Sequence, residues 1–331
     1  MSRGSGESPP ARRRLLAGAL CAVLAAGCAS GNGASRPLPE APALQADTEP
    51  LPATTPPSEP APATPVPEVA APPATAAPAP PPVGPQLGPG PAPPATPAAL
   101  GAELARVEVA LRDPATPAGE LAALGLAQQV ATRQLAGNPG WRPEVLRAVP
   151  APLQRAVVAN ADAEVRMASM VSRRPTTFPK WRIVPPPPPA EVLAAHKAAG
   201  AEIGVPWPVL AAIHLVETRM GRIRGVSTAG ARGPMQFLPS TWAIYGAGGD
   251  IEDLDDASKA AARLLKRNGI NADPRKAVWN YNHSYAYVDA VLAYAAVMTA
   301  DPAAFNGYHG WQVFYRHAQG DTLLPEGWSG A

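Results

Sequence analysis

Residues 204–242 read GVPWPVLAAIHLVETRMGRIRGVSTAGARGPMQFLPSTW and contain an apolar helix with one acid, a glycine-rich loop and the string GPMQF. Pro208 suits the first turn of a helix, because its missing N–H would have no partner there. Apolar side chains then recur at helical spacing, at Val209, Leu210, Ile213, Val216 and Met220. At about 100° per residue, Glu217 falls inside this apolar stripe. The pattern therefore predicts a carboxyl group that faces the core or the wall of a cleft.

Two interpretations of Glu217 follow from its position. In the first, it is a structural carboxylate at the edge of the core, paired with an arginine such as Arg219, Arg222 or Arg224. In the second, burial disfavours its charged form and raises its pKa, so that it holds a proton at neutral pH. Such a group can donate that proton to a leaving oxygen. The helix alone favours the structural interpretation.

Further motifs change this balance. The chain carries Glu217-Thr218, then Ser227-Thr-Ala-Gly-Ala-Arg-Gly-Pro-Met-Gln236, and later Tyr281-Asn282. In order and spacing they resemble the lytic transglycosylases of the lysozyme-like superfamily, which are related to goose-type lysozyme and cleave peptidoglycan. The resemblance covers roughly residues 190–300. It implies a mainly α fold, with a lysozyme-like helical catalytic domain over residues 186–331.

The resemblance also implies roles for individual residues. Glu217 is the catalytic residue in this comparison, and Ser227 hydrogen-bonds and orients it. Seven side chains match substrate-binding positions of this family: Ser227, Met235, Gln236, Phe237, Tyr281, Asn282 and Tyr287. Two departures concern the shape of the cleft: Pro234 stands where relatives often have Leu, and His283-Ser284 where many have Gly-Gly. We expect His283 to face solvent in a turn.

No second acid shares both a motif position and an apolar setting with Glu217, whereas most glycosidases need two carboxylates. The resemblance therefore implies that Glu217 acts as acid and then as base, forming a 1,6-anhydro-MurNAc end in a lyase reaction without cofactor or metal. The acids between Asp250 and Asp256 are expected to cap a helix. Three alternatives stay open: a muramidase-type hydrolase using water, with Asp250 or Asp253 as second carboxylate, a non-catalytic peptidoglycan-binding protein, and a scaffold whose function lies in residues 28–180.

The first residues are typical of an export signal. Three arginines, Arg12 to Arg14, precede a twelve-residue apolar run, Leu15 to Ala26, which is too short to span a bilayer. The run ends in Leu-Ala-Ala-Gly-Cys28, which resembles a bacterial lipoprotein box and predicts a lipid on Cys28. The alternative is a plain signal peptide cleaved near Ala26. We expect residues 1–27 to be removed and the protein to be anchored on the outer face of a membrane, toward the cell wall.

Composition limits the possible partners. Without residues 1–27 the chain keeps 24 basic and 25 acidic side chains, a formal charge of −1, and no basic run typical of nucleic-acid binding. Cys21 leaves with the signal, so no disulfide is expected. The expected partners are peptidoglycan glycan strands and the membrane, and we expect a monomer.

The remaining segments divide by composition. Residues 28–98 are rich in proline and alanine and predict a disordered linker. Residues 99–185 predict a helical subdomain of unassigned role, with helices at 100–113, 117–136, 142–147 and 152–171. Five prolines at 185–189 then precede a helix over 190–202. Further helices are expected from Ser240, from Asp255 or Asp256 to Asn268, from Asp273, over 287–298, and at Trp311–His317.

Overall fold

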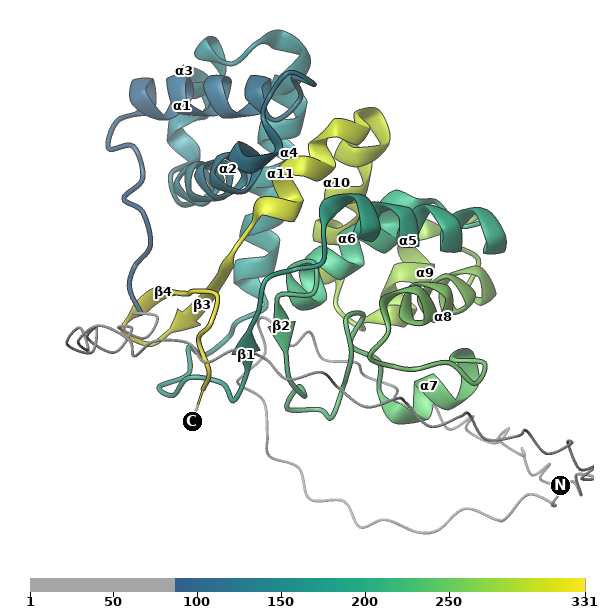
Figure 1. The fold of residues 1–331 in the computed structure, drawn as a ribbon. Coiled ribbons are helices and arrows are strands. Elements are labelled where there is room, and N and C mark those ends of the chain that lie inside the picture. Colours follow the sequence, from purple (N-terminus) through teal and green to yellow (C-terminus); the bar gives the residue numbers. More distant parts are fainter. Residues whose placement is uncertain (1–86, 331) are drawn as a thin grey trace, which may run out of the picture. The chain divides into compact units, whose positions relative to one another are not determined.

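The computed structural model describes residues 87–330. Within this range the chain is mainly helical, with eleven α-helices, three short 3₁₀ helices and two small two-stranded sheets (Figure 1). The predicted mainly α fold class is confirmed for these residues. The predicted signal segment, Cys28 and most of the predicted linker lie outside the described residues.

Four α-helices precede the five-proline tract, as expected. They and two 3₁₀ turns are α1 (Pro97–Ala110), η1 (Ala118–Glu120), α2 (Leu121–Gly137), η2 (Pro139–Trp141), α3 (Arg142–Ala148) and α4 (Ala151–Ser169). Thr96 caps α1 by accepting a hydrogen bond from the N–H of Ala99. The segment before α1 also packs on the fold, because the carbonyl of Gly88 accepts a hydrogen bond from the N–H of Leu323 at 2.7 Å. Among the residues of the predicted linker 28–98, the described ones therefore pack on the fold instead of standing apart from it.

The second half contains seven α-helices and one 3₁₀ turn. These are α5 (Pro189–Ile203), α6 (Trp207–Thr218), α7 (Pro239–Tyr245), α8 (Leu254–Arg267), α9 (Pro274–Tyr281), α10 (Tyr285–Ala300), η3 (Pro302–Ala304) and α11 (Phe305–Gly310). Asp253 caps α8 by accepting the N–H of Asp256 at 2.9 Å, so the prediction of a helix cap in this acidic stretch is confirmed. Asp273 and Ser284 cap α9 and α10 in the same way.

The two sheets are short and antiparallel. Strand β1 (Arg182–Ile183) pairs with β2 (Ile223–Arg224), and β3 (Val313–His317) pairs with β4 (Gly320–Leu324). The helix expected at Trp311–His317 is therefore wrong, because most of that stretch forms β3. Val313, Phe314 and Tyr315 are residue types that favour strands, and the short link to β4 closes a hairpin.

The main hydrophobic core lies around α6 and α10. Helix α10 packs against both α6 and α4, and α6 also packs against α5 (Figure 1). Ala163 and Met167 of α4 join this core, although they precede the expected domain boundary at residue 185. A separate small cluster of Leu, Val and Ala side chains lies among α1 to α4. The helical region before residue 185 thus shares its packing with the residues that follow.

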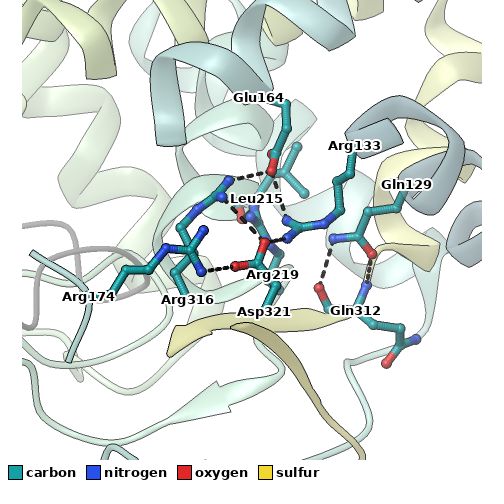
Figure 2. Close-up of polar contacts among 9 residues, drawn as sticks. All are labelled: Gln129, Arg133, Glu164, Arg174, Leu215, Arg219, Gln312, Arg316 and Asp321. Atoms are coloured by element: carbon teal, nitrogen blue, oxygen red, sulfur yellow. Dashed lines mark hydrogen bonds and ion pairs between the residues drawn. The ribbon is translucent and has the colours of Figure 1, made fainter. Parts of the chain in front are cut away.

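A charged network connects α2 and α4 to the β3–β4 hairpin (Figure 2). Arg133 and Arg316 both donate to one carboxylate oxygen of Glu164, at 2.8 and 2.5 Å. Asp321 accepts hydrogen bonds from Arg133 and from Arg174, the latter at 2.7 Å, and forms an ion pair with Arg316. Each carboxylate therefore holds at least two guanidinium groups, which fixes the hairpin to the helices.

Candidate active site

Helix α6 is buried on all sides instead of along one stripe. Every residue from Pro208 to Thr218 is buried, including Glu217, whose side chain lies in the last helical turn with 2% of its surface exposed. A helix that is apolar all round belongs in a core. The helix ends because Arg219 and Met220 adopt left-handed backbone conformations, with φ of 53° and 58°. The predicted burial of Glu217 is confirmed.

Tyr287 holds the carboxyl group of Glu217. The tyrosine hydroxyl donates a hydrogen bond to Oε1 of Glu217 at 2.8 Å, across 70 residues of sequence. Tyr287 lies in the first turn of α10 and has no exposed surface. Ser284 accepts the N–H of Tyr287 at 3.4 Å and caps the helix there. The structure thus brings together Glu217 and Tyr287, and the fixed helix start aims the hydroxyl at the acid.

Two hydroxyl groups hold the GPMQF loop against the end of α6. Thr218 donates to the carbonyl of Pro234 at 2.7 Å and accepts the N–H of Gly221 at 3.2 Å. Tyr281, at the end of α9, donates to the carbonyl of Met235 at 2.6 Å. Consecutive carbonyl groups of the loop are therefore fixed from α6 and from α9. Thr218 entered the sequence comparison only as the neighbour of Glu217, and its role in holding the loop was not predicted.

Gly233 lets the loop approach the segment before α8. Its φ is +73°, and a Cβ atom at this position would lie 1.8 Å from the carbonyl oxygen of Ile251. No side chain can therefore replace its hydrogen without a shift of backbone. Gln236 also has a left-handed φ, of 50°, which is uncommon for a residue other than glycine. Backbone strain of this kind gathers at binding and catalytic sites.

Two amide groups near this loop have polar atoms that find no partner in the described part of the chain. Oε1 of Gln236 and Nδ2 of Asn282 are buried and make no hydrogen bond to the described residues. The other end of Gln236 donates to the carbonyl of Gly233 at 3.0 Å, which fixes the amide orientation. A buried acceptor and a buried donor that lack partners are costly unless a ligand or water satisfies them. They suit a ligand with amide and hydroxyl groups.

A cavity of about 230 Å³ adjoins these residues. Its lining includes Gln236, Phe237, Tyr281 and the exposed His283. Phe237 packs edge-on against Trp242 and Tyr281, with ring centroids 5.5 and 5.9 Å away, so one aromatic cluster forms part of the wall. The expectation that His283 faces solvent is confirmed.

The other predicted residues lie as follows. Met235 has no exposed surface and belongs to the core, and its carbonyl is the atom that Tyr281 holds. The hydroxyl oxygen of Ser227 accepts the N–H of Ala231 at 2.9 Å, which is a turn interaction. A hydrogen bond from Ser227 to Glu217 stays a prediction.

Comparison of the chain with protein family models, with curated proteins and with solved structures found no match. The resemblance to lytic transglycosylases therefore stays a prediction from the motifs. Among residues 87–330, no three or more His, Cys, Asp and Glu side chains form a group that could hold a metal ion. No helix in the described part of the chain is both long and apolar enough to cross a membrane.

Proposed function

We propose that the protein is a peptidoglycan lytic transglycosylase that cleaves the MurNAc–GlcNAc β-1,4 bond with Glu217 as its single acid and base. The observation that carries this proposal is the hydrogen bond from Tyr287 to the buried Glu217. A carboxyl group held in a fixed orientation at the end of a helix, beside a loop with unpartnered amide atoms, suits proton transfer to a bound sugar.

The chemistry needs one carboxyl group. Glu217 would first give its proton to the glycosidic oxygen, while the bond from that oxygen to C1 of MurNAc breaks. The N-acetyl group of the same sugar would stabilise the positive charge that develops at C1. The carboxylate of Glu217 would then take the proton of the C6 hydroxyl, whose oxygen forms the new bond to C1. The product is a 1,6-anhydro-MurNAc end, and no water is consumed.

The positions of the nearby acids support this reaction over hydrolysis. Most glycosidases that hydrolyse such a bond use a second carboxyl group of the enzyme, placed beside the sugar. Asp253, which caps α8 through Oδ1, lines a cavity that Glu217 does not line, and Asp250 accepts the N–H of Glu252 at 2.9 Å. A muramidase-type hydrolase and a non-catalytic wall-binding protein remain the alternatives that the experiments below separate.

The proposed location follows from the sequence. With a lipid on Cys28, the protein would lie on the outer face of a bacterial membrane, and residues between Cys28 and the described fold would let it reach glycan strands. We further propose that it acts as a monomer. Replacing Cys28 with alanine and separating membrane from soluble fractions tests the anchor. The variant should become soluble, and a variant that stays in the membrane fraction would contradict the lipid anchor.

A matched pair of variants tests the catalytic role. The chain without residues 1–27 is incubated with purified peptidoglycan, and soluble glycan fragments are measured for the wild type, Glu217→Gln and Glu120→Gln. Glu120 is an exposed residue of η1, so its variant makes the same chemical change away from the site. We expect release by the wild type and the Glu120 variant and none by Glu217→Gln. Equal release by all three would exclude Glu217 as the catalytic group.

A further inference from the structure

A second cleft is lined in part by Pro234 of the GPMQF loop. A cavity of about 220 Å³ is lined by residues of the proline tract, α6, β2 and the start of α8, namely Pro187, His214, Gly221, Arg224, Pro234, Glu252, Asp253 and Leu254. A neighbouring cavity of about 500 Å³ follows α5 and shares three of these residues, Pro187, Asp253 and Leu254. We call the two cavities together the α5–α8 cleft. Neither cavity is lined by Glu217 or Gln236.

The imidazole ring of His214 lines the cleft, and one of its nitrogens makes no hydrogen bond to the described residues. His214 has no exposed surface, and its Nε2 makes no hydrogen bond to the described residues. Its Nδ1 lies 3.1 Å from Nε2 of His196, whose Nδ1 lies 3.1 Å from the hydroxyl of Ser258. Burial lowers the pKa of His196 to about 3 and that of His214 well below its usual value, so both rings are neutral at pH 7. Nε2 of His214 therefore needs a hydrogen-bond partner that residues 87–330 do not supply.

Gly221 leaves the space in which such a partner can lie. A Cβ atom at Gly221 would stand 3.5 Å from Nε2 of His214 and 3.4 Å from the ring of Pro187. The backbone there has a φ of +85°, which favours glycine. Gly221 thus has a backbone conformation that favours glycine, and its lack of a side chain leaves the space beside the imidazole of His214 open. A small polar group in the cleft can reach Nε2.

The lining of the cleft carries both signs of charge. In the smaller cavity Arg224 provides a guanidinium group, and Glu252 and Asp253 provide carboxylates. Glu191 and Asp255 add two carboxylates to the cavity along α5. Among the described residues, none of Arg224, Glu252 and Asp253 forms an ion pair with another side chain, in contrast to the arginine network of Figure 2. Asp253 uses Oδ1 for its helix cap, which leaves its charge in place. Charged groups that are not neutralised within the protein attract a ligand with complementary charges.

We propose that the α5–α8 cleft binds an α-amino-acid group, with its ammonium at Glu252 and Asp253, its carboxylate at Arg224, and a polar hydrogen at Nε2 of His214. A diamino acid with one end free is the ligand class that fits both the mixed charges and the extension of the cleft along α5. Such an end occurs in free amino acids and in the peptides attached to cell-wall glycans. The second source rests on the proposed function, whereas binding of the free amino acid does not.

The cleft and the candidate active site share the GPMQF loop. Pro234 lines the cleft, while its carbonyl accepts the hydrogen bond of Thr218 beside Glu217. Ile251, next to Glu252, lies directly against Gly233. A ligand that carries both a glycan and a diamino acid would thus have contacts on two sides of the GPMQF loop.

Binding is measured by titration calorimetry with meso-diaminopimelate on the Glu217→Gln chain without residues 1–27, so that catalysis does not interfere. Pimelate, which lacks the ammonium groups, and 1,5-diaminopentane, which lacks the carboxylates, are the comparison probes. We expect diaminopimelate to bind at least about tenfold more tightly than either, because only it matches both signs of charge. Absence of binding at millimolar concentration, or equal binding of all three probes, would overturn the proposal.

Matched variants locate the binding. Asp253→Asn keeps a side chain that caps a helix but removes the charge, and Asp273→Asn makes the same change at the cap of α9, outside the cleft. The double variant Glu252→Gln/Asp253→Asn should bind diaminopimelate at least about tenfold more weakly than the parent chain, and Asp273→Asn should bind it as tightly as the parent. An equal loss of affinity in the double variant and in Asp273→Asn would contradict the proposed position of the ammonium group. Circular dichroism of each variant is recorded to check that it is folded.

Nuclear magnetic resonance tests the imidazole contact. In ¹⁵N-histidine-labelled protein, the His214 Nε2 signal should move on addition of diaminopimelate, and a signal that stays fixed at saturation would contradict the contact.

A disaccharide-peptide that ends in diaminopimelate distinguishes the two possible sources of the ligand, the free amino acid and the wall peptide. Tighter binding than the free amino acid, lost on N-acetylation, indicates the wall peptide, and weaker binding indicates a free amino acid. Undiminished binding after N-acetylation of either ligand would overturn the ammonium contact.

Discussion

The hydroxyl of Tyr287 provides the sharpest test of the site, because Tyr287→Phe removes one oxygen atom and leaves the ring in place. That oxygen donates to Glu217 at 2.8 Å, between two side chains with 0% and 2% of their surface exposed. Removing one partner of a buried hydrogen bond leaves the other polar atom without water or protein contact, which costs about 1–3 kcal/mol. We expect the free energy of unfolding to fall by about 2 kcal/mol.

The same change should reduce catalysis. Without the hydroxyl of Tyr287, the carboxyl group of Glu217 loses a contact that fixes its rotamer. Misplacement of a catalytic group by about 1 Å can lower the reaction rate by a factor of about 100. We therefore expect release of glycan fragments to fall roughly 10- to 100-fold. For a unit of this size, a loss of about 2 kcal/mol lowers the melting temperature by about 4–8 °C, so activity is compared at a temperature below the unfolding transition of the variant.

Tyr294 supplies the matched control on the same helix. It is also fully buried, but its hydroxyl makes no hydrogen bond to the described residues. Tyr294→Phe removes a polar atom without a partner, so stability should stay the same or rise. Urea unfolding and glycan release are measured for both variants. If the Tyr287 and Tyr294 variants lose equal stability and equal activity, the hydrogen bond to Glu217 has no special role and the reasoning fails.

Three further predictions concern the loop, the buried histidines and the charged network. Gly233→Ala should lower the free energy of unfolding by about 2–4 kcal/mol, because its Cβ meets the carbonyl of Ile251, whereas Gly230→Ala, with open space and only an unfavourable φ, should cost about 1 kcal/mol in urea unfolding. His196 has a folded-state pKa of about 3 against about 6.5 when unfolded, so below pH 6.5 the unfolded chain binds more protons, and stability should fall by about 2 kcal/mol between pH 6.5 and 5 through this residue alone. An unfolding free energy that stays constant over this range would contradict the assignment of a neutral buried ring. Asp321→Asn should cost about 2 kcal/mol by releasing three arginines, while Asp162→Asn, which breaks one exposed pair, should cost under about 1 kcal/mol in the same assay; equal effects would show that the network adds nothing.

Local patterns predicted the helices and the burial of Glu217 because these depend on nearby residues. Helix starts followed from proline and from caps such as Asp253 and Asp273, whose effect is confined to one turn. The stretch Trp311–His317 was misassigned because a short apolar run fits a helix or a strand equally well. Its structure is decided by pairing with Gly320–Leu324 and by packing of its aromatic residues, which periodicity does not report.

The contacts that give the site its shape join distant residues. Tyr287 reaches Glu217 across 70 positions, and Ser258 reaches His196 across 62. The sequence identifies hydroxyl and imidazole groups, but which donor meets which acceptor depends on how α6, α8 and α10 pack. The motif placed Tyr287 among the site residues, whereas His214 belongs to none of the motif positions. Its cleft became apparent only with the fold.

The central claim is that Glu217 cleaves a glycan without adding water. Peptidoglycan is digested by the chain without residues 1–27 in ¹⁸O-labelled water, and the masses of the new reducing ends are measured. A transglycosylase forms the bond to C1 from the C6 hydroxyl of the same sugar, so we predict 1,6-anhydro ends that are one water lighter than hydrolysed ends and carry no label. Reducing ends that contain ¹⁸O would show that water is the nucleophile and would contradict the account.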